Sequence, residues 1–196
     1  MAQFFPSDQA ALFYNLAATL WILSEIVGSF LIPSLRRRGA KIERRDRGSR
    51  FLIVGTIFLS IGIGFTFAAL GITRLPDWVS YAGSALMLAG IVLRQWSIAV
   101  LGGYFSQSVG IQEGQKVVSS GPYRLIRHPS YTGALMIITG VGLALRSLGA
   151  VVVILVLVGL AFRHRIRTEE QVLASELGDA YVQYSKRTKR LIPYIW

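Results

Sequence analysis

Polar and ionisable side chains gather in residues 121–133, GPYRLIRHPSYTG, which lie between long apolar runs. Pro122 and Pro129 lack a backbone N–H and bias the preceding residue away from helical geometry, so we expect a shaped loop that leads into a helix. Beside a bilayer, charged groups such as Arg127 and His128 are costly unless they bind or pair with something. We therefore predict a functional site here; the alternative is a basic loop that only fixes membrane topology.

Two further polar features follow this loop: the acidic pair Glu169 and Glu170 within EEQVL, and Arg190 at the start of RLIP. The pattern RHPxYxG, preceded by GPY and followed by EExxL and RLIP, resembles the isoprenylcysteine carboxyl methyltransferase family, which is related to membrane phospholipid methyltransferases. The resemblance runs over residues 101–193 and includes LGGYFSQSVGIQEGQKVVSS before the loop. RHPxY alone is less specific, because sterol-reductase-like membrane enzymes carry a similar motif.

The resemblance implies S-adenosylmethionine as cofactor and transfer of its methyl group, with the RHPxY stretch and the acidic pair at the reaction site. The expected cofactor-binding residues are Tyr123, Arg127, His128, Pro129, Tyr131, Glu169 and Glu170. The expected catalytic residues are Arg127, Glu170 and Arg190. The expected rim of the pocket consists of Gln112, Glu113, Gly114, Val117 and Val118.

Methyl transfer is a displacement at a carbon activated by positive sulfur, so the site has to align the reactants and exclude water. An acceptor carboxylate is already ionised at neutral pH, and Arg127 or Arg190 would hold it. A glutamate would then hold that arginine or a group of the cofactor. An amine acceptor arrives as an ammonium and would instead need a base, either Glu169 or Glu170.

The composition excludes several classes of protein. Of the 196 residues 53% are hydrophobic, yet the net charge is +11, a combination that ordinary soluble domains do not show. Without cysteine there is no disulfide frame, cysteine-ligated zinc or iron–sulfur cluster, and with two histidines we expect no protein-held metal. No GxGxxG loop follows a strand, which excludes a soluble Rossmann methyltransferase. The basic residues fall in predicted cytoplasmic loops, which favours a membrane surface over nucleic acid.

Five apolar runs predict an all-α, polytopic integral membrane protein with about five transmembrane helices. The runs are residues 10–35, 51–72, 78–101, 131–145 and 148–162. The last two are short for a full span and should form a tight hairpin. Small residues such as Gly83 and Gly90 suggest that the second and third helices pack together. We expect one domain over residues 1–196, with a three-helix part at 1–101 and the cofactor-binding and catalytic core at 102–196.

The positive charges predict the topology. Of the 21 Lys and Arg, 18 lie in three segments: eight in residues 36–50, three between the third and fourth runs, and seven after residue 162. All three segments share one side if the N-terminus is outside, and that side is then the cytoplasm. We therefore expect an N-terminus outside, a cytoplasmic C-terminus and a retained first helix, in either a bacterial inner membrane or an endoplasmic reticulum.

The tail, residues 163–196, is expected to be helical to about residue 184 because apolar residues recur at three- and four-residue intervals. Thr168 with Gln171 would form a capping box, which would place Glu169 and Glu170 in the first turn of a new helix. Alternatively, the fifth helix continues unbroken through this point.

Two charges lie inside predicted spans at a similar depth, Glu25 in the first and Arg94 in the third. A lone ionised group at that depth costs several kcal/mol, whereas a facing pair is tolerated. We predict that they pair or that Arg94 points into the active-site cavity; the alternative is a protonated Glu25 in an interhelical hydrogen bond.

The expected partners are a lipidic acceptor that enters from the bilayer and anionic lipids on the cytoplasmic side. The resemblance favours an isoprenylcysteine carboxylate as acceptor, and a phospholipid or amine N-methyltransferase is the nearest alternative. A nicotinamide-dependent reductase would explain RHPSY but not the acidic pair. A small transporter or membrane scaffold is the non-enzymatic alternative, although the repeat-related halves and broken helices of transporters are not evident.

Overall fold

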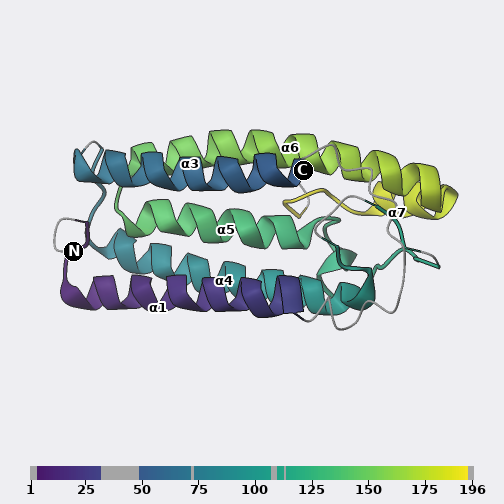
Figure 1. Ribbon diagram of the computed structural model, residues 1–196, viewed down its shortest axis with the longest axis horizontal. Helices are drawn as coiled ribbons and strands as arrows, with labels where there is room; N and C mark the ends of the chain where they lie inside the picture. Colours follow the sequence, from purple (N-terminus) through teal and green to yellow (C-terminus); the bar gives the residue numbers. More distant parts are fainter. Residues whose placement is uncertain (1–3, 32–48, 72, 107–109, 113, 194–196) are drawn as a thin grey trace.

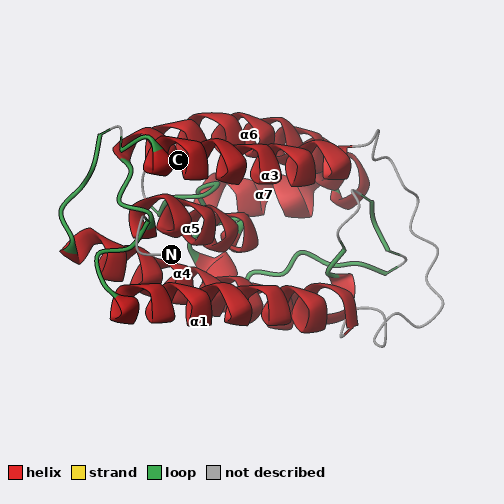
Figure 2. Cartoon of the chain, turned by 60° about the vertical axis from the view of Figure 1, so that its left-hand side comes forward, coloured by secondary structure: helices red, strands yellow, loops and turns green. Residues whose placement is uncertain are grey.

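The computed structural model describes residues 4–31, 49–71, 73–106, 110–112 and 114–193. Over these residues the regular structure is helical (Figure 2), and strand-like pairing is limited to two isolated bridges, Arg74 with Ser147 and Ile126 with Lys189. The all-α prediction is confirmed for this part of the chain. Most of the basic segment at residues 36–50, and Glu113 of the expected rim, lie outside the described residues.

The helices are α1 (Asp8–Ser24) with its π-helical continuation η1 (Glu25–Leu31), α3 (Ser49–Ala69), α4 (Trp78–Leu101), the 3₁₀ turns η2 (Gly102–Tyr104) and η3 (Gly121–Arg124), α5 (Pro129–Ala144), α6 (Leu148–Leu177) and α7 (Asp179–Arg187). Within the described residues, four helical segments are long and apolar enough to cross a membrane: Asp8–Ser29, Phe51–Ala69, Trp78–Tyr104 and Leu148–Leu177. The fifth, α5, is a shorter apolar helix of 16 residues. The predicted polytopic fold is confirmed.

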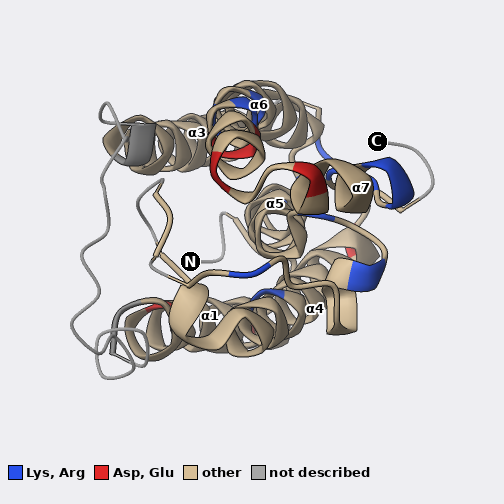
Figure 3. Cartoon of the chain, turned by 90° about the vertical axis from the view of Figure 1, so that its right-hand side faces the viewer, with Lys and Arg blue, Asp and Glu red and all other residues tan. Residues whose placement is uncertain are grey.

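The helices form a bundle with α5 at its centre. Figure 1 shows α3 beside α6 on one side of α5 and α1 beside α4 on the other, and the view along the bundle in Figure 3 shows the same order. Ile138 of α5 packs with Ile154, Val158 and Phe162 of α6 in one buried cluster. The central helix thus joins the two outer pairs.

Glycines set the contact between α4 and α5. A Cβ built on Gly90 would lie 2.7 Å from the carbonyl oxygen of Gly133, and one built on Gly83 would lie 2.7 Å from that of Gly140. The backbones therefore touch at two places one heptad apart. The prediction that the second and third helices pack together is wrong, because the small residues of α4 match glycines of α5, and α3 packs mainly on α6.

The last long helix does not stop at the membrane boundary. α6 contains 30 residues, so at about 1.5 Å per residue it is about 45 Å long, longer than the hydrocarbon core. The predicted capping box is wrong: the Thr168 hydroxyl donates to the carbonyl of His164, 3.2 Å away, within a continuous helix. The alternative of an unbroken helix is confirmed, and it carries Glu169 and Glu170 beyond the apolar part of the bundle.

The end of the bundle opposite α7 is closed by two short turns. The Leu75 amide donates to the Arg146 carbonyl at 2.7 Å, and the Leu148 amide donates to the Thr73 carbonyl at 3.1 Å. Arg146 also forms an ion pair with Asp77. The α5–α6 turn is therefore fixed to the α3–α4 turn, and the polar residues singled out in the sequence lie towards the other end of the bundle.

Candidate active site at one end of the bundle

The loop before α5 is held by the end of the chain. The Arg127 amide donates to the Lys189 carbonyl at 2.7 Å, and the His128 amide donates to the Arg190 carbonyl at 3.0 Å. Pro129 occupies the first helical turn of α5, where a missing N–H has no cost. The expectation of a shaped loop that leads into a helix is confirmed, and RLIP lies directly against RHP.

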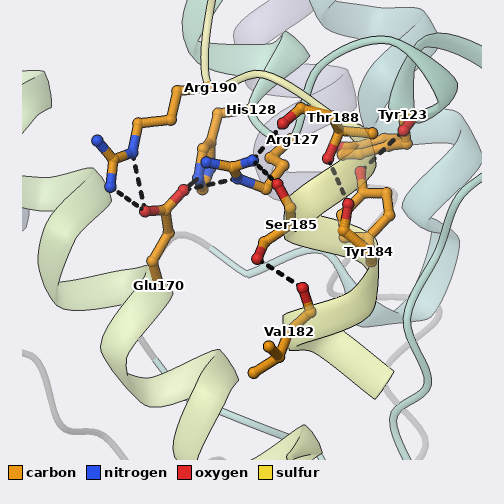
Figure 4. Close-up of polar contacts among 9 residues, drawn as sticks. All are labelled: Tyr123, Arg127, His128, Glu170, Val182, Tyr184, Ser185, Thr188 and Arg190. Atoms are coloured by element: carbon orange, nitrogen blue, oxygen red, sulfur yellow. Dashed lines mark hydrogen bonds and ion pairs between the residues drawn. The ribbon is translucent and has the colours of Figure 1, made fainter. Parts of the chain in front are cut away.

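Glu170 joins three cationic or imidazole groups at this point. Its Oε1 accepts from Arg127 Nε at 2.8 Å and lies 3.4 Å from His128 Nε2, and its Oε2 accepts from Arg190 Nε at 2.9 Å (Figure 4). His128 is only 4% exposed, so its ring position is set by this contact and by packing. The Arg190 guanidinium beside Glu170 has its pKa raised further by that hydrogen bond.

Arg127 also caps the C-terminal end of helix α7. Its Nη1 donates to the carbonyl oxygen of Ser185, 2.7 Å away, and to that of Thr188. Carbonyl groups in the last turn of a helix lack intrahelical partners and favour a cation. Arg127 therefore ties α7 to the loop as well as to Glu170, which leaves it with a large structural role.

Tyr131 bridges a second pair of charges on α6. Its hydroxyl donates to Glu169 Oε2 at 2.9 Å and accepts from Arg165 Nε at 3.2 Å. Arg165 is 3% exposed. The sequence interpretation missed Arg165, although its position one helical turn before Glu169 would have placed both side chains on one face of an unbroken α6.

A cavity of about 310 Å³ opens beside these groups. Of the expected site residues, those that line it are Tyr123, Arg127, His128, Tyr131 and Glu169. Pro129, Glu170 and Arg190 do not line it. From the expected rim, Val117 and Val118 line the cavity, whereas Gln112 is buried and donates from Nε2 to the Gly103 carbonyl at 2.7 Å.

Helix α7 adds tyrosines to the cavity wall. The Tyr184 hydroxyl donates to the Tyr123 carbonyl at 2.8 Å, and burial raises the pKa of Tyr184 to about 12. Tyr181 is 5% exposed and its hydroxyl has no hydrogen-bond partner among the described residues. The sequence interpretation placed both tyrosines on the apolar face of a helix in the tail and gave them no role in the site.

The inner wall contains the ion pair predicted from depth. Glu25 accepts from Arg94 Nε and, at 2.9 Å, from Arg94 Nη2, while Arg94 Nη1 donates to the Ser130 carbonyl at 3.1 Å. Both side chains line the cavity. The predicted pairing is confirmed, and it links η1, α4 and the start of α5.

Comparisons with known proteins identify relatives of this chain. Residues 83–175 match the model of the isoprenylcysteine carboxyl methyltransferase (ICMT) family. Protein-S-isoprenylcysteine O-methyltransferase B of Arabidopsis thaliana is 32% identical over 120 residues, which cover 60% of this chain and 61% of the relative. The protein-S-isoprenylcysteine O-methyltransferase of Schizosaccharomyces pombe is 30% identical over 155 residues, which cover 74% of this chain and 66% of the relative.

A solved structure, that of a eukaryotic intramembrane Ras methyltransferase ICMT, is also similar, with a TM-score of 0.59 and 26% sequence identity. The match covers 74% of this chain and 52% of the other. The chain thus spans about three fifths to two thirds of the length of the two curated relatives.

Fold and site together define a polytopic helical integral membrane protein with a cavity at one end of its bundle that combines apolar walls with a few polar groups. The expected resemblance to the isoprenylcysteine carboxyl methyltransferase family is confirmed, and residues 83–175 carry the pattern of that family.

Proposed function

We propose that this chain is an integral membrane methyltransferase that uses S-adenosylmethionine to methylate the carboxylate of an isoprenylcysteine-like lipidic acceptor. The observation that carries the proposal is the cavity into which Arg127, His128, Tyr131 and Glu169 face, within the segment that matches the family. Its combination of apolar walls and few convergent polar groups is typical of a small-molecule site.

The described residues fit the proposed cofactor. Val117, Val118 and Leu173 offer apolar surface for an adenine ring, and the carboxylate of Glu169 and the unpartnered hydroxyl of Tyr181 offer polar contacts. S-adenosylmethionine supplies a methyl group on a positively charged sulfur. The chain has to orient the two reactants and keep water out, which the buried tyrosines and the loop before α5 can do.

We assign the charged residues to two roles. Arg127 lines the cavity and is the arginine proposed to face the acceptor carboxylate. Glu170 and Arg190 do not line the cavity, so we propose that they act as positioning residues that fix Arg127 and His128. A carboxylate acceptor is ionised at neutral pH and needs no base.

A lipidic acceptor is supported by the apolar part of the cavity wall that α3 contributes. Ile53, Val54 and Ile57 of α3 line the cavity, and such isoleucine and valine surface suits a prenyl or acyl chain. We also propose that the N-terminus is outside and the C-terminus cytoplasmic, because most described lysines and arginines belong to the loop before α5 and to the segment after residue 162. Figure 3 faces this end of the bundle, where anionic lipids would meet them.

The test is calorimetry on the full chain in detergent, with S-adenosylhomocysteine and NADPH as probes. We expect micromolar binding of S-adenosylhomocysteine, at least tenfold weaker binding in His128→Ala, and no binding of NADPH. Transfer of labelled methyl to N-acetyl-S-farnesylcysteine then tests the acceptor, with phosphatidylethanolamine vesicles as the amine alternative. NADPH binding without S-adenosylhomocysteine binding would contradict a methyltransferase, and methylation of the vesicles alone would contradict the carboxylate acceptor.

A further inference from the structure

The two neighbouring glutamates of α6 have different surroundings. Both oxygens of Glu170 accept hydrogen bonds, from Arg127 and from Arg190, and the side chain does not line the cavity. Glu169 lines the cavity, and its Oε2 accepts from Tyr131. Its Oε1 has no hydrogen-bond partner in the part of the chain that the structure describes. Glu169 is therefore the member of the acidic pair that faces the cavity.

Tyr181 provides a second, independent observation. Its ring is buried against the same cavity, yet its hydroxyl lacks a partner among the described residues. A buried hydroxyl without a hydrogen bond costs about 1–3 kcal/mol, so such a group is expected to find its partner in a ligand. Burial, together with the nearby Glu170 and Glu169 carboxylates, raises the pKa of Tyr181. The phenol is therefore neutral and able to accept a hydrogen bond.

The charges around Glu169 indicate which ligand group it takes. Glu25 and Glu169 are the acidic residues among the described lining residues, and Glu25 is neutralised by Arg94. Glu169 would repel an acceptor carboxylate, which excludes it from the acceptor side. Arg165 lies next to Glu169 on the shared Tyr131 hydroxyl, so opposite charges stand side by side. An ammonium group matches a carboxylate that lines the cavity and has one oxygen without a partner among the described residues, whereas ribose hydroxyls require no charged group in the protein.

We propose that Glu169 and Tyr181 bind the ammonium group at the amino-acid end of the methyl donor. The inference deepens the proposed function and rests on it. Glu169 supplies the negative charge and Tyr181 the hydroxyl oxygen, while Glu170 takes no part in ligand contact. An amine acceptor would also carry an ammonium group. Binding of S-adenosylhomocysteine, the product of the methyl donor, is therefore measured without any acceptor, so that only the donor site contributes.

The experiment compares two probes on the full chain in detergent by calorimetry. S-adenosylhomocysteine carries the amino-acid end, and 5′-methylthioadenosine has the adenosine part without it. We expect Glu169→Gln to weaken the binding of S-adenosylhomocysteine by about 10-fold to 100-fold. Tyr181→Phe should weaken the same binding by about 10-fold. Both variants should change methylthioadenosine affinity by less than about threefold, because the lost contact is to a group that this probe lacks.

Tyr184→Phe is the matched control, because its hydroxyl donates within the protein, to the Tyr123 carbonyl. We expect Tyr181→Phe to keep or raise the melting temperature of the free protein and to reduce the increase caused by S-adenosylhomocysteine, and Tyr184→Phe to lower the melting temperature itself. Unchanged S-adenosylhomocysteine affinity in Glu169→Gln, or equal losses for both probes, would overturn the inference and leave the methyltransferase proposal standing. Failure of the unmodified chain to bind S-adenosylhomocysteine would instead remove the methyltransferase proposal, and the inference with it.

Discussion

At the scale of single residues, Glu170 connects segments that are far apart in the sequence. Its carboxylate holds Arg127 from the loop before α5, Arg190 from the closing segment and the ring of His128. Through Arg127 it also supports the last turn of α7. Loss of this one carboxylate would leave several charges without their partner at once.

We therefore predict that Glu170→Gln lowers stability more than it alters the cavity wall. Removing one member of a buried ion pair costs about 3–5 kcal/mol, and the slight exposure of Glu170 reduces this to about 2–4 kcal/mol. The measurement is thermal unfolding of the detergent-solubilised protein. Arg163→Gln, an exposed change on the same helix, serves as control. Equal melting temperatures for the two variants would show that Glu170 does not organise this end.

Residue types indicated much of the site before the structure did. The loop of residues 121–133 was found because its prolines, arginines and histidine are unusual beside a membrane. The different surroundings of Glu169 and Glu170 were not predictable, because they depend on the contact between Arg190, near the end of the described chain, and Glu170 on α6. Arg165 was missed for a related reason: without knowledge that α6 is continuous, its register relative to Glu169 was open.

At the scale of helices, the α4–α5 contact depends on residues without side chains. A Cβ at Gly133 would lie 2.7 Å from the Gly90 carbonyl oxygen and 2.8 Å from Arg94 Cβ. The spans followed from hydropathy, because a bilayer demands long apolar runs, but the end of α6 at Leu177 did not. Hydropathy did not predict which helices pack together. Glycines on α4 allow any helix to approach closely, and only the matching glycines of α5 identify the partner.

We predict that Gly133→Ala destabilises the protein by about 1–3 kcal/mol, because the added methyl group forces α4 and α5 apart. Gly62→Ala in α3 is the control, since a Cβ there meets nothing within 4 Å. It should be neutral or slightly stabilising, as alanine favours helix more than glycine does. Melting temperatures of both variants decide the matter, and a loss in Gly62→Ala as large as that in Gly133→Ala would argue against the close contact.

At the scale of the whole molecule, one ion pair connects the first half of the chain to the cavity. Glu25 and Arg94 bind each other, and Arg94 holds the Ser130 carbonyl at the start of α5. We predict that Glu25→Gln or Arg94→Gln alone destabilises the protein by about 2–4 kcal/mol, because a single charge remains in a spanning helix. The double variant should unfold at a higher temperature than the worse single one. A double variant with the sum of both losses would mean that the groups act independently.

The last prediction concerns orientation in the membrane, and the absence of cysteine makes it directly testable. Gln9 and Lys186 are exposed, Gln9 near the start of α1 and Lys186 in α7 at the site end. If basic loops face the cytoplasm, a membrane-impermeant maleimide added to intact cells should label Gln9→Cys and leave Lys186→Cys unlabelled. Permeabilised cells serve as control, since both variants should then react. The reverse labelling pattern in intact cells would place the site on the outer face of the membrane, where cytoplasmic S-adenosylmethionine does not reach it. That result would contradict both the proposed orientation and the proposed methyltransferase function.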